Sequence, residues 1–228
     1  MSVTAPPAVA VDTHEGLPSP RRLLAFLTVA LGIVMAVLDG TIVNVALPTI
    51  GGDLQATAAE SIWIVTAYQL TVAMALFPLA TLGEAIGFRR IFAIGLVVFS
   101  TASLLCAYSD SRLLLTLARI LQGLGGAALM SVSGALVRFI MPARQLGRGI
   151  AGIAVVVAVS GAAGPTIAAA ILAVTTWHWL FRINVPLGIV CFAIGRITLP
   201  ETPRNGHRFD LVSAGLNALA IGPLIAGL

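Results

Sequence analysis

Long apolar stretches, separated by short polar segments, constrain this chain more than any other feature of its sequence. The first covers residues 23–47 and carries one charged residue, and the fifth covers residues 150–174 and carries none. A helix needs about 20 apolar residues to cross the ~30 Å hydrocarbon core of a bilayer. Hydrophobic residues make up 58% of the chain and charged residues 10%, more apolar surface than a soluble core of this size could bury. We therefore predict an all-α polytopic membrane protein.

The apolar stretches divide the chain into three parts. Residues 1–21 are polar and rich in proline, which predicts a disordered cytoplasmic tail. Residues 22–200 predict a six-helix transmembrane bundle, built from two triplets that form the three-plus-three inverted repeats common in secondary transporters. Residues 201–228 predict a cytoplasmic loop and the start of a seventh helix, which we expect to be truncated. The predicted spans are residues 23–47, 62–82, 91–108, 113–137, 150–174, 180–199 and 211–228.

The distribution of positive charge predicts the orientation of the chain in the membrane. All 13 basic residues are arginines. With a cytoplasmic N-terminus, ten of them fall in cytoplasmic segments, as the positive-inside rule requires. We predict this orientation, in the inner (plasma) membrane. Trp63, Trp177 and Trp179 would then lie at the outer interface, as an aromatic belt does. The ten are Arg21, Arg22, Arg89, Arg90, Arg138, Arg144, Arg148, Arg196, Arg204 and Arg208.

Two charges of opposite sign interrupt the apolar spans at similar depth. Asp39 lies about 12 Å below the outer end of the first span, and Arg119 about 10 Å below the outer end of the fourth, at ~1.5 Å per residue. A charge at the bilayer centre costs roughly 2.5 kcal/mol or more, so pairing would relieve the cost of both. We expect Asp39 to bind and release a proton beside Arg119. The alternative is a permanent ion pair that only fixes helix packing.

Asn44 and Gln122 are polar residues near these charges in the sequence. They could line the same cavity and contact a substrate, or each could form only an interhelical hydrogen bond. Cys106 and Cys191 lie inside apolar stretches and are interpreted as reduced packing residues. We expect no cofactor and no metal site.

Three segments resemble the major facilitator superfamily, and specifically its fourteen-helix drug:proton antiporters. The first span contains LDGTIVNVALP at residues 38–48, which matches that family's signature. The fourth contains LTLARILQGLGGAA at residues 115–128, which is similar to its proton-coupling motif. The segment WHWLFRINVP at residues 177–186 resembles its W-x-W-x-F-x-x-N-x-P pattern. The resemblance covers residues 22–228 and implies the six-helix N-terminal bundle of a facilitator.

The loop between the second and third spans is similar to the family's gating loop, which reads G-x-L-x-D-R-x-G-R-[RK]. Its counterparts here are Glu84, Gly87, Arg89 and Arg90, whereas Ala85 replaces an arginine. The resemblance implies a charge-relay latch that has lost one contact. The alternative role for the two arginines is positive-inside anchoring.

The fifth span resembles the antiporter motif G-x8-G-x3-G-P-x2-G. Gly164 and Pro165 match it, three other glycines are replaced by alanine or serine, and Gly161 lies nearby. Small residues still allow close helix approach, and the proline removes a backbone donor and favours a kink. The resemblance therefore implies an antiporter helix at Gly161, Gly164 and Pro165.

The resemblance implies a secondary active transporter that exports lipophilic, cationic drugs or dyes in exchange for protons. The alternatives are a facilitator-type transporter of another small solute, or a non-transporting membrane remnant. An intramembrane enzyme is not expected, because the spans lack paired aspartates, a Ser/His pair at depth and an H-E-x-x-H motif. The expected partners are a small-molecule substrate, protons and the bilayer, without nucleic acid.

Alternating access needs a second bundle against which the first can close. We therefore expect this chain to be a fragment or truncated form, which requires the missing C-terminal half or a second copy for transport.

Overall fold

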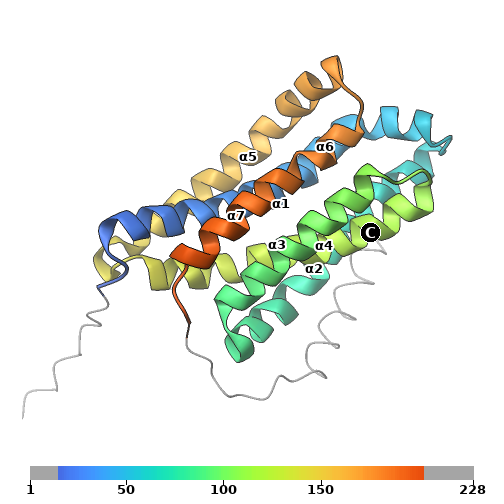
Figure 1. Ribbon diagram of the computed structural model, residues 1–228. Coiled ribbons are helices and arrows are strands. Elements are labelled where there is room, and N and C mark those ends of the chain that lie inside the picture. The colour runs from blue at the N-terminus through green and yellow to red at the C-terminus, as the bar shows by residue number, and fades with distance from the viewer. Residues whose placement is uncertain (1–14, 203–228) are drawn as a thin grey trace, which may run out of the picture.

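The computed structural model describes residues 15–202, which form a bundle of long helices (Figure 1). Six helical segments are long and apolar enough to cross a membrane, which confirms the predicted all-α polytopic fold. The predicted seventh span lies outside the described residues. The elements are α1 (Ser19–Asp53), α2 (Ala58–Ile86), α3 (Phe88–Ala107), α4 (Arg112–Ile140), a 3₁₀ turn η1 (Ala143–Gln145), α5 (Leu146–Val174), α6 (His178–Arg182) and α7 (Asn184–Thr198).

Helix α1 is longer than the span predicted for it. Its 35 residues would extend about 52 Å at ~1.5 Å per residue, which is longer than a ~30 Å hydrocarbon core. The helix begins at Ser19, inside the segment predicted as a tail. Pro20 stands in the first turn, where its missing N–H costs nothing. Just before the helix, the Leu17 N–H donates to the Ile140 carbonyl over 3.0 Å, which ties this segment to the end of α4.

The predicted sixth span is divided at Ile183 into α6 and α7. Pro186 lies in the first turn of α7 and has no N–H, so it cannot donate to the carbonyl of Arg182 four residues earlier. The helical ladder is therefore interrupted at this point. Asn184 is the first residue of α7 and lies inside the bundle, where 6% of it is exposed.

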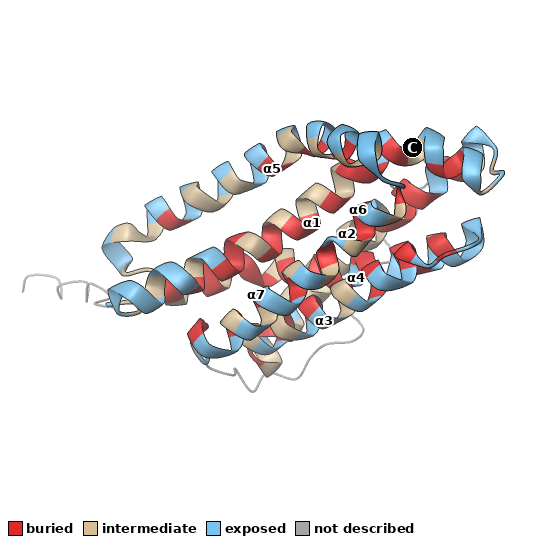
Figure 2. Ribbon diagram, turned by 45° about the horizontal axis from the view of Figure 1, so that its top comes forward, coloured by how far each residue is buried: buried red, intermediate tan, exposed pale blue. Residues whose placement is uncertain are grey.

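Helix α4 is the centre of the packing and contacts α2, α3 and α1. Helix α5 packs mainly against α1 and lies at one side of the bundle (Figure 1). Figure 2 shows that α1 and α4 carry many buried residues, whereas most of α5 is exposed or half-buried. Its exposed residues include Val155, Val159 and Val174, an apolar surface suited to lipid or to another apolar partner.

Two apolar clusters fill the bundle, one toward each end. We call the end with Arg21, Arg89 and Arg138 the basic end, and the end with Trp63 and Trp179 the tryptophan end. The cluster toward the basic end includes Ile33, Phe92, Phe99, Leu129 and Leu136. The cluster toward the tryptophan end includes Ile50, Ile64, Leu115, Leu180 and Phe181.

The three tryptophans do not form a uniform belt. Trp63 and Trp179 are 55% and 49% exposed, as predicted for interfacial residues, whereas Trp177 at the same end is 1% exposed and is covered by protein. Its indole Nε1 donates to Asp53 Oδ2 over 2.8 Å. A buried indole N–H needs an acceptor, and the carboxylate at the end of α1 supplies one. This hydrogen bond ties the α5–α6 connection to α1.

We expect Trp177→Phe to destabilise the bundle by roughly 1–3 kcal/mol, because a part-buried carboxylate loses its donor. Trp63→Phe is the matched control at the same end and should change stability by less than about 0.5 kcal/mol. Thermal unfolding of both variants in detergent measures the difference. Equal effects of the two substitutions would contradict a structural role for the Trp177–Asp53 bond.

Candidate functional site

Asp39 and Arg119 meet in the interior, between the two apolar clusters. Asp39 lies on α1 and is 3% exposed, and Arg119 lies on α4 and is fully buried. Arg119 Nη1 donates to Asp39 Oδ2 in a charge-assisted hydrogen bond. The structure therefore brings together the two charges that were matched by depth in the sequence.

The second carboxylate oxygen is held by two amides from different helices. Gln122 Nε2 on α4 donates to Asp39 Oδ1 over 2.8 Å, and Asn184 Nδ2 on α7 donates to the same oxygen over 3.0 Å. Three side chains thus direct N–H donors at the two carboxylate oxygens. The arrangement stabilises a negatively charged carboxylate in an apolar interior.

The orientation of Gln122 is fixed by its other neighbours. Its Oε1 accepts from Arg119 Nη1 over 2.6 Å, and its Nε2 also donates to Ser103 Oγ over 2.8 Å. The Ser103 hydroxyl proton is already used, because Ser103 Oγ donates to the Phe99 carbonyl over 2.8 Å. Ser103 can therefore only accept from Gln122, and a reversed amide would present its N–H groups to the guanidinium.

Arg119 has several contacts that do not involve Asp39. Its Nε donates to the Ile64 carbonyl over 3.3 Å. Its guanidinium carbon lies 4.2 Å from the centre of the Tyr68 ring and 5.8 Å from that of Phe181, within cation–π range. Tyr68 is itself fixed, because its hydroxyl donates to the Ala36 carbonyl over 2.8 Å. The cation is therefore held in place from α2 and α6 as well as from α1.

Sequence reasoning missed Asn184, Ser103 and Tyr68 as members of this site. Asn184 belongs to the segment that carries the family resemblance, and a polar side chain inside an apolar span was the available signal. Its approach to Asp39 is a contact between α7 and α1, which hydropathy alone does not reveal.

Asn44 was predicted to share a cavity with Gln122, but the structure does not bring the two together. Asn44 is exposed, and its Nδ2 donates to the Gly40 carbonyl of its own helix over 3.2 Å. It follows Asp39 by five residues, a rotation of about 140° at ~3.6 residues per turn, so it lies on another face of α1.

The four residues of the predicted gating loop do not form one cluster: Arg89 faces α7, whereas Glu84 faces a cavity beside α4. Gly87 ends α2 with a φ of +104°, which favours glycine. Arg89 turns toward α7, where its Nη2 donates to the Arg196 carbonyl over 2.5 Å and its Nη1 lies 3.7 Å from Glu201 Oε1. Arg90 is exposed.

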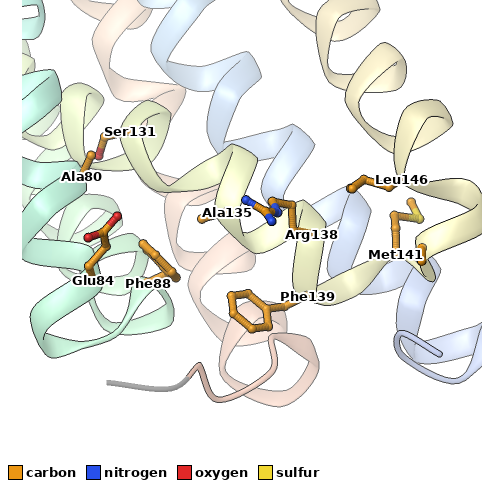
Figure 3. A pocket seen from close by; sticks show the side chains of 10 residues that line it. Ala80, Glu84, Phe88, Ser131, Ala135, Arg138, Phe139, Met141 and Leu146 are labelled. Carbon is orange, nitrogen blue, oxygen red and sulfur yellow. The ribbon is translucent and has the colours of Figure 1, made fainter. Parts of the chain in front are cut away.

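Glu84 instead lines a cavity of about 500 Å³ at the basic end (Figure 3). The cavity also contains Arg138 from α4, together with aromatic and aliphatic side chains from α2, α3 and the start of α5. Within residues 15–202, no group of three or more His, Cys, Asp or Glu side chains could hold a metal ion.

The three residues of the predicted antiporter helix have different surroundings. Gly164 is buried against α1, and a Cβ added there would overlap Thr41 Oγ1 and lie 2.8 Å from Thr41 Cβ. A Cβ at Gly161 would meet nothing within 4 Å. Pro165 is exposed within α5. Of the three, Gly164 sets the distance between α5 and α1.

The sequence of this chain matches a model of the Major Facilitator Superfamily over residues 29–227. This chain belongs to the major facilitator superfamily. It is a multi-pass membrane protein of a transporter family, not an enzyme family. The predicted superfamily is therefore confirmed, and its subgroup remains a prediction.

Three curated bacterial proteins are similar to this chain. It is 56% identical over 216 residues to "Uncharacterized transporter YebQ" of Escherichia coli K12, covering 94% of this chain and 47% of YebQ. It is 36% identical to "Putative multidrug resistance protein MdtD" of Citrobacter koseri, with 90% and 43% covered. It is 32% identical to "Riboflavin transporter RibZ" of Clostridioides difficile, with 79% and 40% covered. The chain spans less than half the length of these relatives.

A solved structure shares the fold. The inward-facing, unoccupied crystal structure of a bacterial homologue of the human lysosomal transporter Spinster superposes with a TM-score of 0.71 at 18% identity. The match covers 83% of this chain and 45% of that one, so it supports the helix arrangement alone.

We expect Gly164→Ala to destabilise the protein by about 1–3 kcal/mol, because the added methyl must separate α5 from α1. Gly161→Ala, three residues away on the same helix, should be neutral or stabilising by up to about 1 kcal/mol. Denaturation in detergent compares the two. A stable Gly164→Ala variant would show that the contact with Thr41 can relax.

Proposed function

We propose that this chain forms the N-terminal bundle of a proton-coupled facilitator of the fourteen-helix drug:proton antiporter group. In this proposal Asp39 carries the proton, and the solute is a lipophilic, cationic drug or dye that leaves the cell. The chain would lie in the inner (plasma) membrane with a cytoplasmic N-terminus, since the arginines gather at the end where the chain begins.

The single observation that carries the proposal is the buried carboxylate at the middle of the bundle. Asp39 is 3% exposed, and a cation and two amides hold it from α4 and α7. Intramembrane ionisable groups more often mark ion pathways than simple packing contacts.

The proposed cycle follows from the charge balance of the pair. With Asp39 deprotonated, the pair is neutral overall and α1 is tied to α4 and α7. A proton on Asp39 leaves Arg119 as a net positive charge and removes the attraction between the two helices. The bundle can then change its packing, and release of the proton on the other side restores the pair.

Transport requires a second bundle against this one, as alternating access does in general. The exposed apolar surface of α5 is one candidate contact for it. We propose that either a C-terminal half or a second copy of the chain supplies this partner.

A second solute class is supported by one of the relatives. RibZ is named as a riboflavin transporter, and its similarity to this chain is close to that of MdtD. Riboflavin is therefore the alternative cargo for the same proton site.

The test is Asp39→Asn in the protein expressed from its own gene with its natural flanking sequence. Asparagine keeps the size of the side chain but cannot exchange a proton. We expect proton-driven uptake of a cationic dye into inverted membrane vesicles, which corresponds to efflux from the cell, to fall to the background of vesicles without the protein, while membrane insertion is unchanged.

Asp53→Asn is the matched control, because Asp53 is the second acid on α1 and its amide can still accept from Trp177. This variant should keep its efflux. Undiminished dye efflux in Asp39→Asn would exclude Asp39 as the proton carrier. Loss of riboflavin transport in place of dye efflux would favour the alternative cargo.

A further inference from the structure

We propose that Asn184 is the partner that changes its hydrogen bond when Asp39 takes up a proton. Its side-chain amide would rotate, so that it donates to the charged carboxylate and accepts from the protonated one. This inference rests on the proposed function of Asp39 and assigns a specific positioning role to a residue at the start of α7.

The geometry first selects the oxygen that can carry the proton. Oδ2 of Asp39 faces Arg119, whose guanidinium has only donors and stays protonated in proteins. An O–H group at that position would point a proton at a cation. Oδ1 faces two amides instead, so the proton is best placed on Oδ1.

A proton on Oδ1 then needs an acceptor within reach. Gln122 cannot provide one, because its oxygen is held by Arg119 and its nitrogen by the oxygens of Asp39 and Ser103. Turning that amide would break all of these bonds at once. Its orientation is therefore the same in both protonation states.

Asn184 has no such restraint. Its Nδ2 donates to Asp39 Oδ1, and no hydrogen bond to its Oδ1 is found among residues 15–202. The two ends of a primary amide have nearly the same shape, so a rotation of about 180° exchanges donor for acceptor without repacking. Asp39 Oδ1 gains one proton, and its new O–H donates to Asn184 Oδ1.

The other titratable groups around Asp39 do not offer this exchange. Arg119 from α4 is a donor only, Tyr68 from α2 donates its proton to the Ala36 carbonyl, and the Cys106 thiol from α3 points to Gln122 Oε1. Phe181 from α6 and Gly164 from α5 lack titratable side chains. In the described part of the chain, no further titratable group binds Asp39.

Protonation of Asp39 would therefore change a hydrogen bond at the start of α7, the second part of the sixth span. Asn184 is the first residue of α7, directly after Ile183, and α7 carries the Arg196 carbonyl that binds Arg89 at the basic end. A reversed hydrogen bond thus changes the contact between α1 and the first residue of α7.

Infrared difference spectroscopy between acidic and alkaline buffer tests the proposal on the full protein in lipid bilayers. The wild type should show a carboxylic-acid C=O band that Asp39→Asn removes. In Asn184→Leu, and in the smaller Asn184→Ala, this band should move to higher wavenumber, because the acid has lost its acceptor. Asn44→Leu is the matched control and should leave the band in place, because Asn44 does not reach Asp39.

A second measurement requires no change at Asn184. Protein with ¹³C-labelled asparagine side chains should show an acid-induced downshift of one amide C=O band, and Asp39→Asn should abolish it. An Asp39 band that stays in place in both Asn184 variants, with no amide shift, would overturn the role of Asn184 alone. The absence of any acid band that depends on Asp39 would overturn the proton-carrier proposal as well.

Discussion

The buried ion pair between Asp39 and Arg119 is the interaction on which the rest of the bundle depends. Each charge would be costly alone in an apolar interior, so neither helix can hold its charge there without the other. The pair joins α1 to α4, Asn184 adds α7, and Ser103 joins α3 through Gln122. Four helices therefore meet at one polar layer between two apolar clusters.

The sequence predicted those parts of the structure that depend on local patterns. Hydropathy located six spans, and counting residues placed Asp39 and Arg119 at the same depth, where the structure pairs them. The angle between two side chains around a helix axis also follows from their spacing in the sequence. That angle could have predicted that Asn44 and Asp39 lie on different faces of α1. Contacts between different helices were harder to predict from the sequence, because they depend on how the helices pack. Asn184 on α7 binds Asp39 on α1, and Trp177 binds Asp53 at the end of α1; neither contact follows from hydropathy.

The two members of the ion pair have unequal freedom to move. Arg119 is held by the Ile64 carbonyl, by Gln122 and by the Tyr68 ring whether or not Asp39 is charged. Asp39 depends on donors that favour its charged form. In the proposed cycle α1 is thus the element that responds to the proton, and α5 would move with it because Gly164 packs tightly against Thr41.

A double-mutant cycle on the ion pair tests this account most directly. Asp39→Leu and Arg119→Met would each leave one buried charge without its partner, and each should reduce the free energy of unfolding in detergent by about 3–5 kcal/mol. The double variant removes both charges, so its loss should be far smaller than the sum of the two. Losses that simply add would show that the charges act independently, and would contradict the pair as the interaction that organises the bundle.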